Sequence, residues 1–123
     1  MRFLTDRKRA EGLGSGKSGT AHHWYMQVSA VGLAVLVPLF ILTFGRIVGA
    51  DHATVVEYYG RPFPAIVAGL TLWVGMLHFR HGAQMMIEDY AGGFTRKALI
   101  VGTICLTYGT IATGLYALIR LAL

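Results

Sequence analysis

The sequence predicts an all-α membrane protein in which three transmembrane helices cross the bilayer. Only 14% of its 123 residues are charged and 54% are hydrophobic, whereas an average soluble domain carries about 25% charged residues. The apolar residues gather into three blocks, and a spanning helix needs about 20 such residues. We expect a polar, basic leader over residues 1–21 and a three-helix anchor over residues 22–123, with helices at about residues 22–46, 62–89 and 97–120.

The first and third blocks are each long enough for one crossing. His22–Gly45 contains no Asp, Glu, Lys or Arg, and Pro38 within it predicts a kink because proline lacks a backbone N–H. A cleaved signal peptide would have a shorter polar leader before the apolar block and a small-residue cleavage site after it. Here the leader is long and no such cleavage site follows. Ala98–Ile119 forms the third block, with 22 positions that carry no charge.

The second block needs polar residues to complete its span. Pro62–Leu77 is only 16 residues long, which is marginal for crossing about 30 Å of hydrocarbon. We therefore expect the helix to continue through the segment HFRHGAQMMIEDY. This continuation carries His78, Arg80 and His81 toward or into the bilayer.

The distribution of basic residues predicts the orientation, because Lys and Arg are enriched in cytoplasmic connections. The leader and the connection after the second helix hold seven of them, whereas the first connection and the C-terminal end hold three. We therefore expect a cytoplasmic amino terminus, a periplasmic carboxyl terminus and a second helix that runs inward. This orientation puts Asp89 and Tyr90 at the cytoplasmic surface.

Three other kinds of site are excluded by composition and spacing. The basic residues form no stripe with interleaved aromatic residues, so a nucleic-acid interface is not expected. The single cysteine, Cys105, allows neither a disulfide framework nor a zinc site. The connection after the first helix contains Asp51, His52 and Glu57, but their spacing matches no common ligand pattern, and we expect a solvated turn there.

Small residues along the third helix predict close helix packing, since they let helix backbones approach each other in lipid. The alternative is the general enrichment of membrane helices in glycine. These small residues are Gly102, Thr103, Gly109, Thr110, Thr113 and Gly114.

His78 is the ionisable residue nearest the middle of a span, which makes it a functional candidate. A neutral imidazole in a helix bundle can ligate haem iron, and Gly82, one turn away, leaves room for a flat group. The alternatives are a structural histidine bonded to Ser or Thr of a neighbouring helix, and a proton relay. Neither other span has a histidine at depth, so a haem with two histidine ligands would need the second from another chain.

Asp89 and Tyr90 form a second candidate site. Asp89 lies eleven residues after His78, which returns it to within roughly 20° of the same helix face, about 16 Å nearer the cytoplasm. A phenol can donate a hydrogen bond to a quinone carbonyl, and a carboxylate can relay protons. The alternative is an interfacial pair without further function, because tyrosine is enriched at membrane interfaces.

These residues carry a resemblance to a known family. Three spans, a basic leader that ends in HHWYMQVSA, and His78, Gly82, Asp89 and Tyr90 within HFRHGAQMMIEDY resemble the small hydrophobic membrane anchor of succinate dehydrogenase (respiratory complex II) of the alphaproteobacterial type. The resemblance covers about residues 18–123, and its specific part is the second helix.

The resemblance implies a multi-pass protein of the bacterial inner membrane that is not catalytic by itself. It implies three partners, namely a second membrane anchor of the cytochrome b556 type, an iron–sulfur subunit and a flavoprotein subunit, in addition to membrane lipid. Haem b would lie between the two anchors with His78 as one axial ligand and Gly82 packed against it. Ubiquinone would contact Tyr90, with Asp89 beside it.

One position departs from the family pattern. Relatives usually carry an arginine where this chain has Gln27, so a role for that arginine cannot be transferred. Candidates for a haem-propionate contact or for supporting the site are then His22, His23, Arg80 and His81. The alternative function is a non-redox accessory or proton/ion-transport subunit, in which His78, Arg80 and Asp89 form a polar track.

Overall fold

The computed structural model describes residues 5–12 and 19–123, and every regular element in these ranges is an α helix. Three of the helices are long and apolar enough to span a membrane, with 26, 29 and 30 residues in their spanning parts. The prediction of an all-α protein with three spanning helices is confirmed, whereas the orientation across the membrane stays a prediction. In chain order the helices are α1 (Asp6–Glu11), α2 (Gly19–Gly45), α3 (His52–Tyr59), α4 (Pro62–Tyr90) and α5 (Gly93–Ala122).

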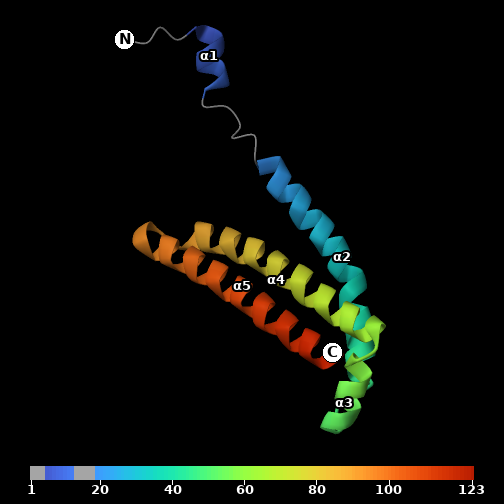
Figure 1. The fold of residues 1–123 in the computed structure, drawn as a ribbon. Coiled ribbons are helices and arrows are strands. Elements are labelled where there is room, and N and C mark those ends of the chain that lie inside the picture. The colour runs from blue at the N-terminus through green and yellow to red at the C-terminus, as the bar shows by residue number, and fades with distance from the viewer. Residues whose placement is uncertain (1–4, 13–18) are drawn as a thin grey trace.

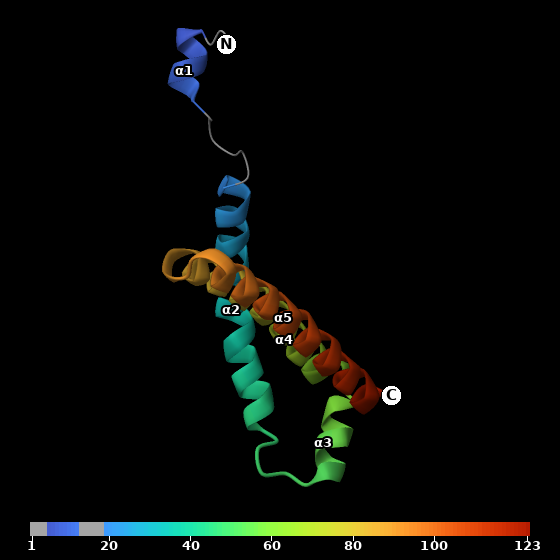
Figure 2. The same ribbon diagram turned by 90° about the vertical axis from the view of Figure 1, so that its left-hand side faces the viewer.

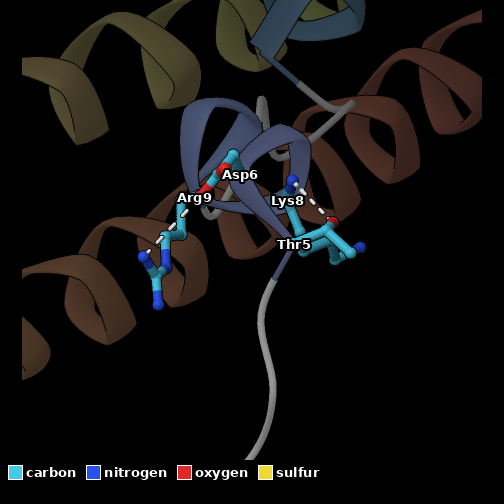
Figure 3. Close-up of polar contacts among 4 residues, drawn as sticks. All are labelled: Thr5, Asp6, Lys8 and Arg9. Carbon is cyan, nitrogen blue, oxygen red and sulfur yellow. Dashed lines mark hydrogen bonds and ion pairs between the residues drawn. The ribbon is translucent and has the colours of Figure 1, made fainter.

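Two short helices lie in segments where none was expected. In the leader, the Thr5 hydroxyl accepts a hydrogen bond from the Lys8 backbone N–H at 3.3 Å and caps α1, and an exposed Asp6–Arg9 pair at 3.7 Å spans one turn (Figure 3). In the connection after α2, the Asp51 carboxylate accepts from the backbone N–H of the residue three positions on and caps α3. This cap satisfies a free N–H of the first helical turn, so the segment forms a helix where a turn was expected. Asp51, His52 and Glu57 are nevertheless exposed, as expected for a solvated segment. Residues 1–4 and 13–18 of the leader lie outside the described residues.

Two of the long helices contain proline. α2 begins at Gly19 and continues through Pro38 to Gly45. α4 starts with Pro62, a residue favoured at the first helical position, and continues beyond Leu77 to Tyr90 in one piece.

α4 is the central helix of the bundle. It packs against α2 along one side and against α5 along the other, while no Cα atom of α2 comes within 8 Å of α5 in the described residues. Figures 1 and 2 show α4 and α5 running antiparallel side by side, with α2 crossing them. The turn between α4 and α5 is tight and uses Gly93 at φ 56°, a left-handed conformation that glycine adopts without strain.

Small residues let these helices approach each other. At Gly114 of α5, an added Cβ would overlap the Leu72 side chain of α4, so the packing role expected for this residue is confirmed. A Cβ added at Gly102 or Gly109 would meet no side chain within 4 Å, so no such role is seen for these two glycines within the described residues. The most buried side chain of α5 is instead Thr107, which is fully enclosed.

The internal core is small and lies where α3 meets the three long helices. Ile47, Tyr59 and Ala68 are its buried residues, and the Tyr58 hydroxyl donates to the Thr43 carbonyl at 3.0 Å. Only 11% to 17% of each spanning segment is buried inside the chain. Most of the apolar surface is therefore left to be covered by lipid or by other chains.

Candidate functional site

His78 lies in α4 on the side that packs against α2. Its Nδ1 atom is 2.8 Å from the Oγ atom of Ser29, a buried residue of α2. This is the type of contact expected for a histidine bonded to a hydroxyl of a neighbouring helix. It occupies one ring nitrogen, and Nε2 has no hydrogen-bond partner in the described residues.

A shallow groove of about 230 Å³ adjoins His78. Its other lining residues belong to α2 and are His23, Met26, Gln27 and Ala30. The amide of Gln27, at the position where an arginine was expected from the resemblance, therefore lies on the same groove as the imidazole.

A larger groove of about 530 Å³ continues along α2 and shares two of these residues. Its lining is His23, Trp24, Gln27, Val28 and Val31. Two adjoining grooves therefore lie along the face of α2 next to His78, and most of their surface is apolar.

Gly82 lies one turn after His78, against α2. The nearest atom to an added Cβ would be the Met26 methyl group at 3.9 Å, which is ordinary van der Waals contact. The methionine side chain of α2 therefore occupies the space beside Gly82, and the role expected for Gly82 in accommodating a flat group stays a prediction.

His81 lies about one helical turn after His78 in α4, and its ring lies near that of His22 in α2. His81 donates from Nδ1 to the Leu77 carbonyl at 2.8 Å, and its ring lies 4.5 Å from the Tyr25 ring and 5.1 Å from the His22 ring. The Nε2 atom of His22 is buried and has no hydrogen-bond partner within the described chain. His23, in contrast, lies on the groove beside His78.

Arg80 belongs to a different face of α4. Its guanidinium donates to the Tyr108 hydroxyl of α5 at 3.1 Å and lies 5.6 Å from the centre of that ring. Its Nε atom is buried without an acceptor in the part of the chain that the structure describes. Arg80 therefore faces α5, whereas His78 faces α2, and the two side chains do not share a site inside this chain.

Asp89 and Tyr90 lie at the C-terminal end of α4, and both are exposed, Tyr90 to 89%. Because α4 is continuous, Asp89 lies about 16 Å along the helix from His78. The neighbouring Glu88 accepts a hydrogen bond from Gln84 at 2.8 Å, whereas no hydrogen bond or ion pair of the Asp89 and Tyr90 side chains is observed within the described residues.

The structure also limits what this chain can bind by itself. Among the residues that it describes, no group of three or more His, Cys, Asp or Glu side chains could hold a metal ion.

Comparison with known proteins decides the family. Residues 1–117 match the family described as succinate dehydrogenase/fumarate reductase transmembrane subunit. The chain belongs to this family. The succinate dehydrogenase hydrophobic membrane anchor subunit of Paracoccus denitrificans is 49% identical over 123 residues, which cover 100% of this chain and 95% of the relative.

A more distant relative covers less of this membrane anchor. The succinate dehydrogenase hydrophobic membrane anchor subunit of Rickettsia bellii (strain RML369-C) is 30% identical over 89 residues, or 72% of this chain and 70% of the relative. No solved structure gives a significant match. The resemblance drawn from the sequence is confirmed at the level of the family, while the roles of individual residues stay predictions.

The sequence offered a serine or threonine of a neighbouring helix as one possible partner of His78, but it indicated neither Ser29 in particular nor Tyr108 as the partner of Arg80. Ser29 and Tyr108 each bond to a predicted residue, but each belongs to a different helix from its partner. A serine and a tyrosine are common in membrane helices, and only the packing of α2 and α5 on α4 brings them to His78 and Arg80.

Proposed function

We propose that this succinate dehydrogenase membrane anchor provides one axial ligand of a haem b through His78 and one wall of a ubiquinone site at Tyr90 and Asp89. Electrons from succinate oxidation would reach the quinone through an iron–sulfur and a flavoprotein subunit. A second membrane anchor would complete the haem site. An anchor of this family associates with other subunits of its complex, and we place the whole in a bacterial inner membrane.

The haem proposal is supported mainly by the two ring nitrogens of His78, of which one has a hydrogen-bond partner and the other has none within the described residues. Nδ1 contacts Ser29, whereas Nε2 has no bond in the described chain and the imidazole adjoins a groove. A haem requires a neutral imidazole nitrogen and space for a flat ring, and the residues present fit both requirements. When bound, the haem supplies one-electron redox chemistry.

The remaining residues of the groove suit the edge of such a ring. His23 and Gln27 offer polar groups, and Met26 and Ala30 offer apolar contact. The imidazole of His22, with its unpaired buried Nε2, is a further candidate for a propionate contact. Arg80 is the weakest candidate for that role because its guanidinium is directed to α5.

The quinone proposal depends on the end of α4. The Tyr90 hydroxyl would donate a hydrogen bond to one quinone carbonyl, and the Asp89 carboxylate would accept and pass on a proton. Reduction of ubiquinone to ubiquinol takes up two electrons and two protons. Both side chains are exposed, so a lipid-soluble carrier can reach them at the membrane surface.

The test of haem ligation is His78→Ala in the purified complex, with reduced-minus-oxidised spectra recorded in mild detergent. We expect loss or a marked shift of the b-type bands while the peripheral subunits stay bound. His52→Ala, an exposed histidine at the start of α3, is the matched control and should leave the bands unchanged. Unchanged bands in His78→Ala would refute the ligand assignment. An unaltered complex without any haem would favour an anchor that binds no haem, or the transport alternative.

The test of the quinone site is Tyr90→Phe, which removes only the hydroxyl. We expect slower succinate-dependent reduction of ubiquinone and an unchanged rate with a water-soluble dye as electron acceptor. Tyr116→Phe, at another exposed tyrosine, should change neither rate. Equal rates of quinone reduction in Tyr90→Phe and the unaltered complex would exclude a quinone contact by this hydroxyl.

A further inference from the structure

Ser29 makes two contacts that together determine where the His78 proton lies. Its hydroxyl donates to the Met26 carbonyl at 3.0 Å in the same helix, and the same Oγ is 2.8 Å from Nδ1 of His78. Ser29 is only 7% exposed, so water does not compete freely for either contact. The hydroxyl has a single hydrogen to donate.

Counting hydrogens leaves one arrangement that makes both bonds. A carbonyl oxygen can only accept, so the serine hydrogen is directed to Met26. The contact with His78 is then a hydrogen bond only if Nδ1 carries a hydrogen and donates it to Oγ. In a neutral imidazole one nitrogen is the donor and the other is the acceptor, so Nε2 has the free lone pair.

We infer that Ser29 is a positioning residue that holds His78 in the Nδ1–H tautomer and directs the ring so that the Nε2 lone pair can bind iron. The inference rests on the proposed function, since it assigns a role to Ser29 in the same haem site. A hydrogen bond from the far nitrogen of a ligating histidine fixes both its tautomer and its ring orientation, and it raises the basicity of the ligand.

The bond from His78 to Ser29 also affects the redox properties of the proposed site. A more basic imidazole stabilises ferric more than ferrous iron and lowers the midpoint potential. Ser29→Ala removes the acceptor for Nδ1–H, so the midpoint potential should rise. Loss of such a supporting bond typically weakens metal binding by about 10–100-fold, and haem should be lost sooner from the detergent-solubilised complex.

The experiment compares three variants of the assembled complex by potentiometric titration of the b-type bands and by the low-spin ferric electron paramagnetic resonance signal. We expect a raised potential and a shifted resonance in Ser29→Ala. Ser29→Thr retains the hydroxyl and should restore both values. Thr43→Val is the matched control, because Thr43 is another buried residue of α2, 8% exposed, and within the described residues its hydroxyl bonds only to carbonyls of its own helix.

The tautomer can also be determined without haem. The complex is purified from cells in which haem synthesis is blocked, and the ¹⁵N chemical shifts of His78 are measured by nuclear magnetic resonance. A hydrogen on Nδ1 supports the inference, and this measurement decides it if Ser29→Ala fails to assemble. A hydrogen on Nε2, or an unchanged potential and resonance in a haem-loaded Ser29→Ala complex, overturns the inference. A complex that lacks haem while His78 still carries its hydrogen on Nδ1 would refute the proposed function and leave the role of Ser29 in setting the tautomer standing.

Discussion

The contact between Arg80 and Tyr108 should stabilise the pairing of α4 with α5. Arg80 is a charged residue inside a predicted span, where an unpaired charge is costly. Its guanidinium bonds to the Tyr108 hydroxyl at 3.1 Å and lies 5.6 Å from the centre of the ring. Tyr108→Phe removes the hydrogen bond and keeps the ring, whereas Tyr108→Leu removes both.

The structure sets the size of the two effects. A hydrogen bond to a charged group contributes about 1.5–3 kcal/mol, and we take the lower part of that range because Tyr108 is 49% exposed. Tyr108→Phe should therefore lower the free energy of unfolding by roughly 1.5–2 kcal/mol. Tyr108→Leu should lose a further amount of about 0.5–1 kcal/mol from the interaction of the cation with the ring.

The assay is a double-mutant cycle in which the free energy of unfolding is measured by titration with sodium dodecyl sulfate in mixed micelles. In an Arg80→Met background, Tyr108→Phe should have almost no effect, because the charged donor is gone. Tyr116→Phe is the control, at an exposed tyrosine of the same helix for which no hydrogen bond is observed within the described residues. The explanation fails if Tyr108→Phe costs the same in both backgrounds, or no more than Tyr116→Phe.

Two further predictions concern packing and capping. Gly114→Ala should have a free energy of unfolding lower by about 1–3 kcal/mol than Gly109→Ala, because the new methyl group meets Leu72 at the first position and open space at the second; equal values in the same unfolding assay would contradict this. Hydrogen bonds from the side chain and the backbone of Thr54 lower the pKa of Asp51 below 3.8. The capping contribution should therefore be complete above about pH 4 and be lost as the pH falls through the lowered pKa. The Thr54 amide resonance, followed by nuclear magnetic resonance, should shift over that range, and a shift that persists in Asp51→Asn would show that another group causes it.

The spans could be predicted from the sequence because they depend on composition and length. A run such as His22–Gly45 has no charge over more than 20 positions, and a bilayer of about 30 Å requires such a run. The continuation of α4 past Leu77 also followed from length, since the shorter helix would be marginal. The short helix α3 was missed because its formation depends on a single capping side chain, Asp51, and on a small core.

The sequence by itself determined the family, the three spans and the residues that are unusual inside them. His78 stands out for a local reason, namely that an ionisable group at membrane depth is rare, and so its position could be found without coordinates. The alignment of Asp89 on nearly the same face of α4 followed from helix geometry alone.

Only the tertiary structure decided which helix each of these side chains meets. His78 and Arg80 are two residues apart, which rotates them by about 200° on a helix, and so one faces Ser29 on α2 and the other faces Tyr108 on α5. The partner of each depends on which faces of α2 and α5 pack against α4. Packing of that kind joins residues 28 and 49 positions apart, and no local pattern in the sequence encodes it.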